Sequence, residues 1–221
     1  MKAVVFDAYG TLLDFHAAMA RHADRLGTDW QRISADWRTK QTEYSWVRSL
    51  AGPAHHRDFW RLTEESLRFV AARHGIADEA LLADVLASYR VLDAYPDAAT
   101  VLRALRDRGL GRAILSNGEP EMLTAAVESA GLADLLDAVL SVESVGVFKP
   151  DPRVYRLAET HFGLTAAEMG FVSSNPWDAF GAAAHGFWVF WVNRTGQPAE
   201  YDLAGKVTEL KNLLGLMEAL T

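Results

Sequence analysis

The stretch VVFDAYGTLLD, Val4–Asp14, decides how this chain folds. Its apolar start is typical of a buried strand, and Asp7 stands where that strand ends, directly before a Gly-Thr turn. This arrangement places a carboxylate at the carboxyl end of a strand, the edge at which open α/β sheets bind ligands. Asp7 is therefore either an aspartate that caps the turn or a nucleophilic carboxylate.

Four further apolar runs alternate with helical patterns, which predicts a parallel sheet with crossover helices. These runs are RAILSN at 112–117, DAVLSV at 137–142, GFVSSN at 170–175 and WVFWVN at 188–193. Helices are predicted to begin near Asp97, Glu119, Asp151 and Trp177, and a last helix is predicted from about Thr208 to Leu220. The predicted fold class is α/β, with a Rossmann-like core.

Residues 14–93 interrupt this alternation. They are rich in Trp, Arg, His and Leu, follow a helical pattern and contain no convincing strand. The chain returns to the sheet pattern at DAYPDA, Asp93–Ala98, where Pro96 stops a helix. We therefore predict a core domain of residues 1–13 and 94–221, with a helical cap domain of residues 14–93 inserted after the first strand.

The composition is that of an ordinary globular protein, with 50% hydrophobic and 23% charged residues among 221. The net charge is −7 and there is no basic stripe, so no nucleic-acid partner is expected. The lack of cysteine excludes disulfides, a thiolate nucleophile and Cys-ligated zinc. No apolar run approaches the ~18 residues of a spanning helix. No signal-peptide pattern precedes the first strand, so we expect a cytoplasmic protein without a membrane partner.

Polar or small side chains stand at the carboxyl ends of four predicted strands. They are Asp7, the pair Ser116–Asn117, Ser141 and the segment Ser173–Asn175. Because parallel strands end at one edge of a sheet, these side chains are expected to converge on one site.

Four separated segments resemble the haloacid dehalogenase superfamily, and more narrowly its L-2-haloacid dehalogenases. The segments are FDAYGTLLD (6–14), LSNG (115–118), VFKPDPRVY (147–155) and FVSSNPWDAFGA (171–182). The segment WRTKQTEYSWVRSLAG (37–52) resembles the cap of the narrower group, so the resemblance covers nearly the whole chain. It implies hydrolysis of short (S)-2-haloalkanoic acids to (R)-2-hydroxy acids and halide through an aspartyl ester, without a metal or other cofactor. A homodimer is typical of the family.

The resemblance makes Asp7 the nucleophile and Lys149 the cation that keeps it ionised. Such a partner is needed because a buried carboxylate otherwise takes up a proton. Thr11 and Tyr155 match residues that orient the nucleophile and the lysine by hydrogen bonds. The alternatives are a turn residue for Thr11 and core packing for Tyr155.

The substrate carboxylate is expected at the turn after the second core strand. There the resemblance assigns the Ser116 hydroxyl, together with the backbone N–H groups of Ala8 and Tyr9. A serine at this place also fits a helix N-cap, and both roles are compatible. Phe59 matches an aromatic residue of the apolar wall around the substrate, although an aromatic in a helix is more often simply core.

The resemblance implies that Arg38, Asn117 and Trp177 bind the departing halide. An isolated arginine on a helix is usually solvated, but Arg38 lies inside the cap segment that resembles the family's. Thr39 and Thr42 depart from the family pattern, in which we expect larger pocket residues. A roomier or more polar pocket follows from that departure.

The water that cleaves the ester is assigned to Ser173, Asn175 and Asp178. The sequence Pro176-Trp177-Asp178 also reads as a plain helix start, with proline in the first turn and an early acid. The structural role and the catalytic role can hold together.

Tyr9 separates this reading from its main rival, a magnesium-dependent phosphatase of the same superfamily. Phosphatase relatives carry a second aspartate where Tyr9 stands, and further acids in the last motif, which here opens with Ser173 and Ser174. A hard dication prefers several oxygen ligands, and this site offers few carboxylates. A non-catalytic binding protein is a weaker alternative, because Asp7, Lys149 and Asp178 are all present.

Overall fold

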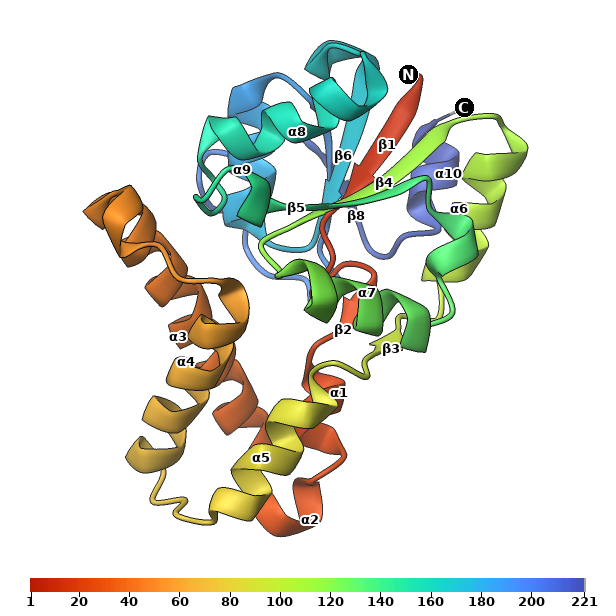
Figure 1. The fold of residues 1–221 in the computed structure, drawn as a ribbon. Helices are drawn as coiled ribbons and strands as arrows, with labels where there is room; N and C mark the ends of the chain where they lie inside the picture. The colour runs from red at the N-terminus through yellow and green to blue at the C-terminus, as the bar shows by residue number, and fades with distance from the viewer. Residues whose placement is uncertain (221) are drawn as a thin grey trace.

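Within residues 1–220, which the computed structural model describes, six strands form one sheet in the order β5-β4-β1-β6-β7-β8 (Figure 1). The strands are β1 Ala3–Phe6, β4 Gly111–Ser116, β5 Ala138–Ser141, β6 Met169–Ser173, β7 Trp188–Val192 and β8 Thr208–Leu210. Every pairing in this sheet is parallel, so the carboxyl ends of the strands meet at one edge. The predicted α/β class with a parallel sheet is confirmed.

Strand β1 lies inside the sheet, and all four of its residues are fully buried. Its run of consecutive apolar residues fits a strand that is covered on both faces. Phe6 pairs with Ile114 of β4 on one side and with Val172 of β6 on the other. The next residue, Asp7, therefore leaves the sheet between the ends of two neighbouring strands.

Helices cover both faces of the sheet, with α6 and α10 on one side and α8 and α9 on the other (Figure 1). The core helices are α6 Ala98–Asp107, α7 Pro120–Ser129, α8 Pro152–Phe162, α9 Pro176–His185 and α10 Gly215–Ala219. Proline is the first residue of α7, α8 and α9, a position where its missing N–H is harmless. Short 3₁₀ turns occur at Pro53–His55, Ala133–Leu135, Val142–Ser144 and Ala166–Glu168. The four predicted helix starts are confirmed to within one residue.

The segment between β1 and α6 is helical, as predicted, and its helices gather at one end of the molecule, away from the sheet (Figure 1). They are α1 His16–Ala20, α2 Ala23–Leu26, α3 Trp30–Ala51, α4 Phe59–Arg73 and α5 Glu79–Ser88. Two short strands that the sequence reading did not anticipate, β2 Leu13–Asp14 and β3 Asp93–Ala94, pair antiparallel where the chain leaves and rejoins the core. No helix between residues 1 and 220 is long and apolar enough to cross a membrane.

The predicted helix from about Thr208 to Leu220 is wrong in its first part. Residues Thr208–Leu210 form strand β8, which extends the sheet beside β7, and helix α10 begins only at Gly215. The structure of this segment is set by its pairing with strand β7 and not by its local helical propensity. Thr221, the last residue of the predicted core domain, lies outside the described residues.

Asp97 ties distant parts of the core together at the start of α6. Its carboxylate accepts hydrogen bonds from Arg194 Nη1 and Nη2 at 2.9 and 3.1 Å, and from the backbone N–H of Leu213 at 2.7 Å. Arg194 also donates to the carbonyl of Thr11, in the turn after β1. One carboxylate thus holds the segments that follow β7 and β8 against the start of the chain.

We expect Asp97→Ala to lower the free energy of unfolding by about 3 kcal/mol, because it leaves a largely buried guanidinium without its carboxylate. Urea denaturation measures this loss. Asp107→Ala, which removes an exposed carboxylate from the other end of the same helix, is the matched control and should change stability by less than about 0.5 kcal/mol. Equal effects of the two substitutions would contradict the role given to Asp97.

Candidate active site

The turn after β1 presents Asp7 at the carboxyl edge of the sheet. The backbone N–H of Asp7 still donates to Val172 O of β6 at 2.9 Å, so the sheet fixes its position. The chain then reverses at Gly10, whose φ of 91° lies in the left-handed region that favours glycine. Asp7 is 4% exposed, so this carboxylate is held almost out of water.

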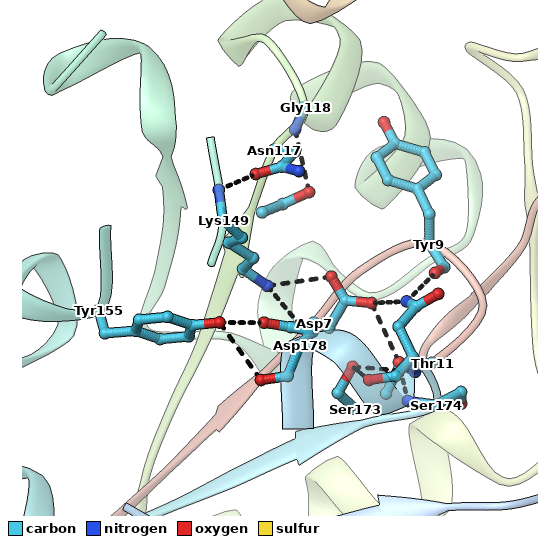
Figure 2. A network of polar contacts seen from close by, with 12 residues as sticks. Asp7, Tyr9, Thr11, Asn117, Gly118, Lys149, Tyr155, Ser173, Ser174 and Asp178 are labelled. Carbon is cyan, nitrogen blue, oxygen red and sulfur yellow. Dashed lines mark hydrogen bonds and ion pairs between the residues drawn. The ribbon is translucent and has the colours of Figure 1, made fainter. Parts of the chain in front are cut away.

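Lys149 places its ammonium group between two carboxylates (Figure 2). Its Nζ lies 3.1 Å from Asp7 Oδ1 and 2.8 Å from Asp178 Oδ2. The lysine is fully buried, and so is Asp178. A charge taken out of water requires partners of opposite sign, and Lys149 is that partner for both carboxylates, while each of them is one for the lysine.

The second oxygen of Asp7 is held by two further donors. Asn175 Nδ2 donates to Asp7 Oδ2 at 2.8 Å, and Thr11 Oγ1 donates to the same oxygen at 3.2 Å. Thr11 in turn accepts the backbone N–H of Ser174 at 2.9 Å, which fixes its hydroxyl (Figure 2). These bonds fix the orientation of the Asp7 carboxylate.

Asp178 has the shifted titration that a general base needs. Burial raises its pKa to about 6, with Lys149 opposing that shift and the charge of Asp7 adding to it. The Tyr155 hydroxyl donates to Asp178 Oδ1 at 2.8 Å. Burial raises the pKa of Tyr155 well above its usual value, so this tyrosine stays a neutral donor. A buried carboxyl that titrates near neutral pH is typical of acid–base catalysts.

The ends of β4 and β6 add polar groups around Asp7. The Ser116 hydroxyl accepts the N–H of Gly118 at 3.1 Å, which leaves its hydrogen to donate elsewhere. Asn117 Oδ1 accepts the N–H of Lys149 at 2.9 Å and so orients its own amide group. Ser173 Oγ accepts the N–H of Asn175 at 3.1 Å. The ends of β1, β4 and β6 therefore meet around Asp7, as predicted, whereas the Ser141 hydroxyl at the end of β5 donates to Gly118 O at 2.6 Å.

Tyr9 points away from the ionic network and into the helical segment. Its ring stacks on Tyr89 at 5.4 Å and lies 6.5 Å from the ring of Phe59. Burial raises the pKa of Tyr9 well above its usual value, and the nearby charge of Arg38 opposes this shift. A neutral phenol therefore occupies the position where the rival phosphatase interpretation requires an acid.

Arg38 and Trp177 lie outside the hydrogen-bond network of Asp7. Arg38 projects from α3, with its guanidinium carbon 5.4 Å from the centre of the Phe15 ring. Trp177, in the first turn of α9, meets Trp46 of α3 edge-on at 5.6 Å, and both line a pocket of about 510 Å³ that Lys149 also borders. Among the three residues predicted to bind the halide, Asn117 is the one that hydrogen-bonds to a residue of this network, Lys149.

Contacts between the helical segment and the core were not anticipated from the sequence. Glu143 accepts His56 Nε2 at 2.9 Å and the backbone N–H of Phe59 at 3.3 Å. The Ser49 hydroxyl accepts the N–H of Phe148 at 3.1 Å. These bonds hold the start of α4 and the end of α3 over the loop that carries Lys149.

The sequence reading also missed Gln41, Tyr89 and the backbone of Ser174. Gln41 carried a weak signal, because it is a polar residue three positions after Arg38 and so shares its helix face. By contrast, the two residues singled out for pocket shape make local bonds. Thr39 is exposed and donates to Ala35 O, and Thr42 donates to Arg38 O.

Residues 1–220 contain no cluster of three or more His, Asp or Glu side chains arranged to hold a metal ion. The two carboxylates nearest the nucleophile position, Asp7 and Asp178, both face the Lys149 ammonium. The oxygen of Asp7 that faces away from Lys149, Oδ2, accepts hydrogen bonds from Asn175 Nδ2 and Thr11 Oγ1, so donors surround this carboxylate and these residues do not fit a divalent metal.

The haloacid dehalogenase-like hydrolase family matches residues 1–186. An (S)-2-haloacid dehalogenase of Burkholderia cepacia is 43% identical over 221 residues, which cover 100% of this chain and 95% of the relative. A crystal structure of a dehalogenase superposes with a TM-score of 0.95 at 42% identity, covering 99% of this chain and 96% of the other. An L-2-haloacid dehalogenase of Xanthobacter autotrophicus, solved with covalently bound chloropropionic acid, has a TM-score of 0.88 at 39% identity, covering 100% of this chain and 98% of the other.

We expect Lys149→Met to lower the free energy of unfolding by about 3–5 kcal/mol at about pH 8, because two buried carboxylates lose their cation. Without that cation the buried carboxylates favour their protonated forms, so the native state of the variant binds more protons than its unfolded state as the pH falls. The loss should therefore be smaller at about pH 5.

Urea denaturation at both pH values measures this difference. Lys40→Met, in a partly exposed pair with Glu43, is the matched control and should change stability by less than about 0.5 kcal/mol. A Lys149→Met loss that does not depend on pH would show that the ammonium does not control these carboxylates.

Proposed function

The chain belongs to the haloacid dehalogenase-like hydrolase family, and on that premise we propose that it hydrolyses short (S)-2-haloalkanoic acids to (R)-2-hydroxy acids and halide. The observation that carries this proposal is the buried ammonium of Lys149 between Asp7 and Asp178, beside a neutral Tyr9. This arrangement supplies a nucleophile, Asp7, and a separate base, Asp178. It has no second acid that could protonate a leaving group.

In the first step an oxygen of Asp7 attacks C2 of the substrate from the face opposite the halogen. The O–C2 bond forms as the carbon–halogen bond breaks, and the halide departs with the bonding electrons. Backside attack inverts the configuration at C2. A halide needs no proton on leaving, which agrees with the neutral tyrosine at position 9.

In this proposal the substrate is bound by groups around the Asp7 carboxylate. The Ser116 hydroxyl and the backbone N–H groups of Ala8 and Tyr9 bind the substrate carboxylate. Ser116 supports this role because its oxygen already accepts a backbone N–H and its hydrogen remains to donate. Phe59, whose ring lies near that of Tyr9, forms part of the apolar wall.

The departing halide is stabilised by Arg38, Asn117 and Trp177 in this proposal. Arg38 brings a positive charge from the helical segment, close enough to oppose the pKa shift of Tyr9. Asn117 is fixed through its carbonyl by the N–H of Lys149. Preorganised donors of this kind stabilise charge that develops in a transition state.

In the second step water attacks Cγ of the Asp7 ester. Asp178 takes a proton from the water, and that proton then goes to the oxygen that leaves as the hydroxy acid. The bond from Cγ to that oxygen breaks, and the Asp7 carboxyl that forms loses the second proton of the water to solvent, which regenerates the carboxylate. Tyr155 fixes Asp178 by a hydrogen bond, and Ser173 and Asn175 orient the ester.

A magnesium-dependent phosphatase is the second candidate within the family. It requires a divalent cation beside the nucleophile, but Lys149 Nζ faces one oxygen of Asp7 and the donors of Asn175 and Thr11 face the other. A non-catalytic binding protein would have no need of this ionic network. The geometry therefore favours the dehalogenase.

The division into a core of residues 1–13 and 94–221 and a cap of residues 14–93 belongs to the same proposal, with the cap closing over Asp7. The bonds from Glu143 to His56 and Phe59 support such a closure. We also propose that the chain works in the cytoplasm as a homodimer. The exposed apolar side chains of Val47 and Leu50 on α3 suit a subunit interface.

The wild-type protein is expected to release halide from L-2-chloropropionate in the presence of EDTA, and to leave the D-enantiomer unchanged. Asp7→Asn should lower kcat by a factor of about 10⁴ or more, since no other carboxylate can form the ester. Trapping with Asp178→Asn should raise the mass of the Asp7 peptide by that of chloropropionic acid less HCl.

Two results would count against this mechanism. One is full activity of Asp7→Asn. The other is the absence of halide release combined with magnesium-dependent hydrolysis of a phosphate ester, which would establish the phosphatase.

The turnover rate is expected to fall with acidity below the pKa of Asp178, about 6, because the protonated carboxyl cannot accept a proton from water. Well below that pKa, kcat should drop about tenfold per pH unit. Stopped-flow assays should still record the first equivalent of halide, because Asp178 takes no part in the first step. Asp178→Asn should turn over slowly, without this pH dependence. A wild-type kcat that is flat across this range would exclude Asp178 as the base.

A further inference from the structure

Gln41 is a buried amide that joins three helices of the cap segment. It is 1% exposed. Its Oε1 accepts Arg38 Nη1 at 2.7 Å and the Tyr89 hydroxyl at 3.2 Å, and its Nε2 donates to Thr63 Oγ1 at 2.6 Å. Arg38 and Gln41 share one face of α3, Thr63 lies on α4, and Tyr89 directly follows α5.

The direction of this chain of hydrogen bonds is fixed at its far end. The Thr63 hydroxyl donates to the carbonyl of Phe59 at 2.7 Å, so it has only lone pairs to offer to Gln41. The amide nitrogen of Gln41 must therefore face Thr63, and the amide oxygen must face Arg38. The backbone of α4 thus sets the orientation of the group that holds the guanidinium.

Arg38 is held at one nitrogen while another lacks an acceptor. Its Nε is buried and has no hydrogen-bond partner among residues 1–220, and the same is true of the Tyr9 hydroxyl. A buried donor without an acceptor is unfavourable by about 1–3 kcal/mol. Two such donors, on side chains close enough to influence each other, suit an anion that arrives during the reaction.

We propose that Gln41 is a positioning residue, whose amide oxygen holds the Arg38 guanidinium so that its remaining N–H groups face the departing halide. The inference rests on the proposed dehalogenase function, since it concerns the same site. Gln41 itself does not touch the substrate. Its contribution is to keep the arginine in place before the carbon–halogen bond begins to break.

Such positioning predicts a specific kinetic signature. Loss of the Gln41 oxygen frees the guanidinium, so charge developing on the halogen is stabilised less well. We expect the rate of the first chemical step with L-2-chloropropionate to fall by about 10- to 100-fold, a size typical of a small misplacement. Bromide is the better leaving group and needs less stabilisation, so L-2-bromopropionate should be affected less.

The test measures single-turnover halide release from both substrates. Gln41→Met keeps the side-chain volume but removes the acceptor, and it should raise the bromide-to-chloride rate ratio while changing KM by less than about threefold. Ser45→Ala, which removes a buried hydroxyl that donates to Thr42 O on the same helix, is the matched control and should leave the ratio unchanged.

Gln41→Asn provides the test if Gln41→Met does not fold. It keeps an amide in the cavity but withdraws the oxygen from Arg38, and should raise the ratio in the same way. An equal slowing of both substrates, or a change confined to KM, would overturn the positioning role. Absence of halide release from the wild-type protein would instead overturn the proposed function, and this inference with it.

Discussion

The ammonium of Lys149 is the charge on which the rest of the site depends. It is fully buried and lies within hydrogen-bond distance of both Asp7 and Asp178. Two carboxylates this close repel each other, and in a dry site at least one would take up a proton. The lysine allows both to be charged, but the balance is narrow, because burial still raises the pKa of Asp178 to about 6. One cation thus lies between the proposed nucleophile, Asp7, and the proposed base, Asp178.

The fold supplies this cation and its partners from distant parts of the chain. Asp7 follows the central strand β1, Lys149 lies in the loop between β5 and α8, and Asp178 lies in the first turn of α9. Parallel strands bring these ends to one edge, so short local motifs suffice for each contribution. The helical segment adds what the sheet edge lacks, namely the charge of Arg38 and the aromatic group around Tyr9.

Much of the site could be predicted because each motif announces its own local structure. An apolar run that ends in Asp7 defines a strand end, and Asn175 before a proline defines a helix start. The failures have a different origin. The segment Thr208–Leu210 became a strand through pairing with β7, and β2 and β3 exist only because two chain crossings meet. Local propensity cannot predict pairing with segments elsewhere in the chain.

The sequence by itself determined the α/β class and the nucleophile candidate Asp7, and its resemblance to the haloacid dehalogenases implied the chemistry connected with Tyr9. These follow from residue type and order, which persist in any conformation. Only the tertiary structure decided that Lys149 bridges two carboxylates, that Asp178 titrates near neutral pH, and that Gln41 holds Arg38. The physical reason is that charge stabilisation depends on distance and burial. Both quantities arise only when residues far apart in the chain are packed together.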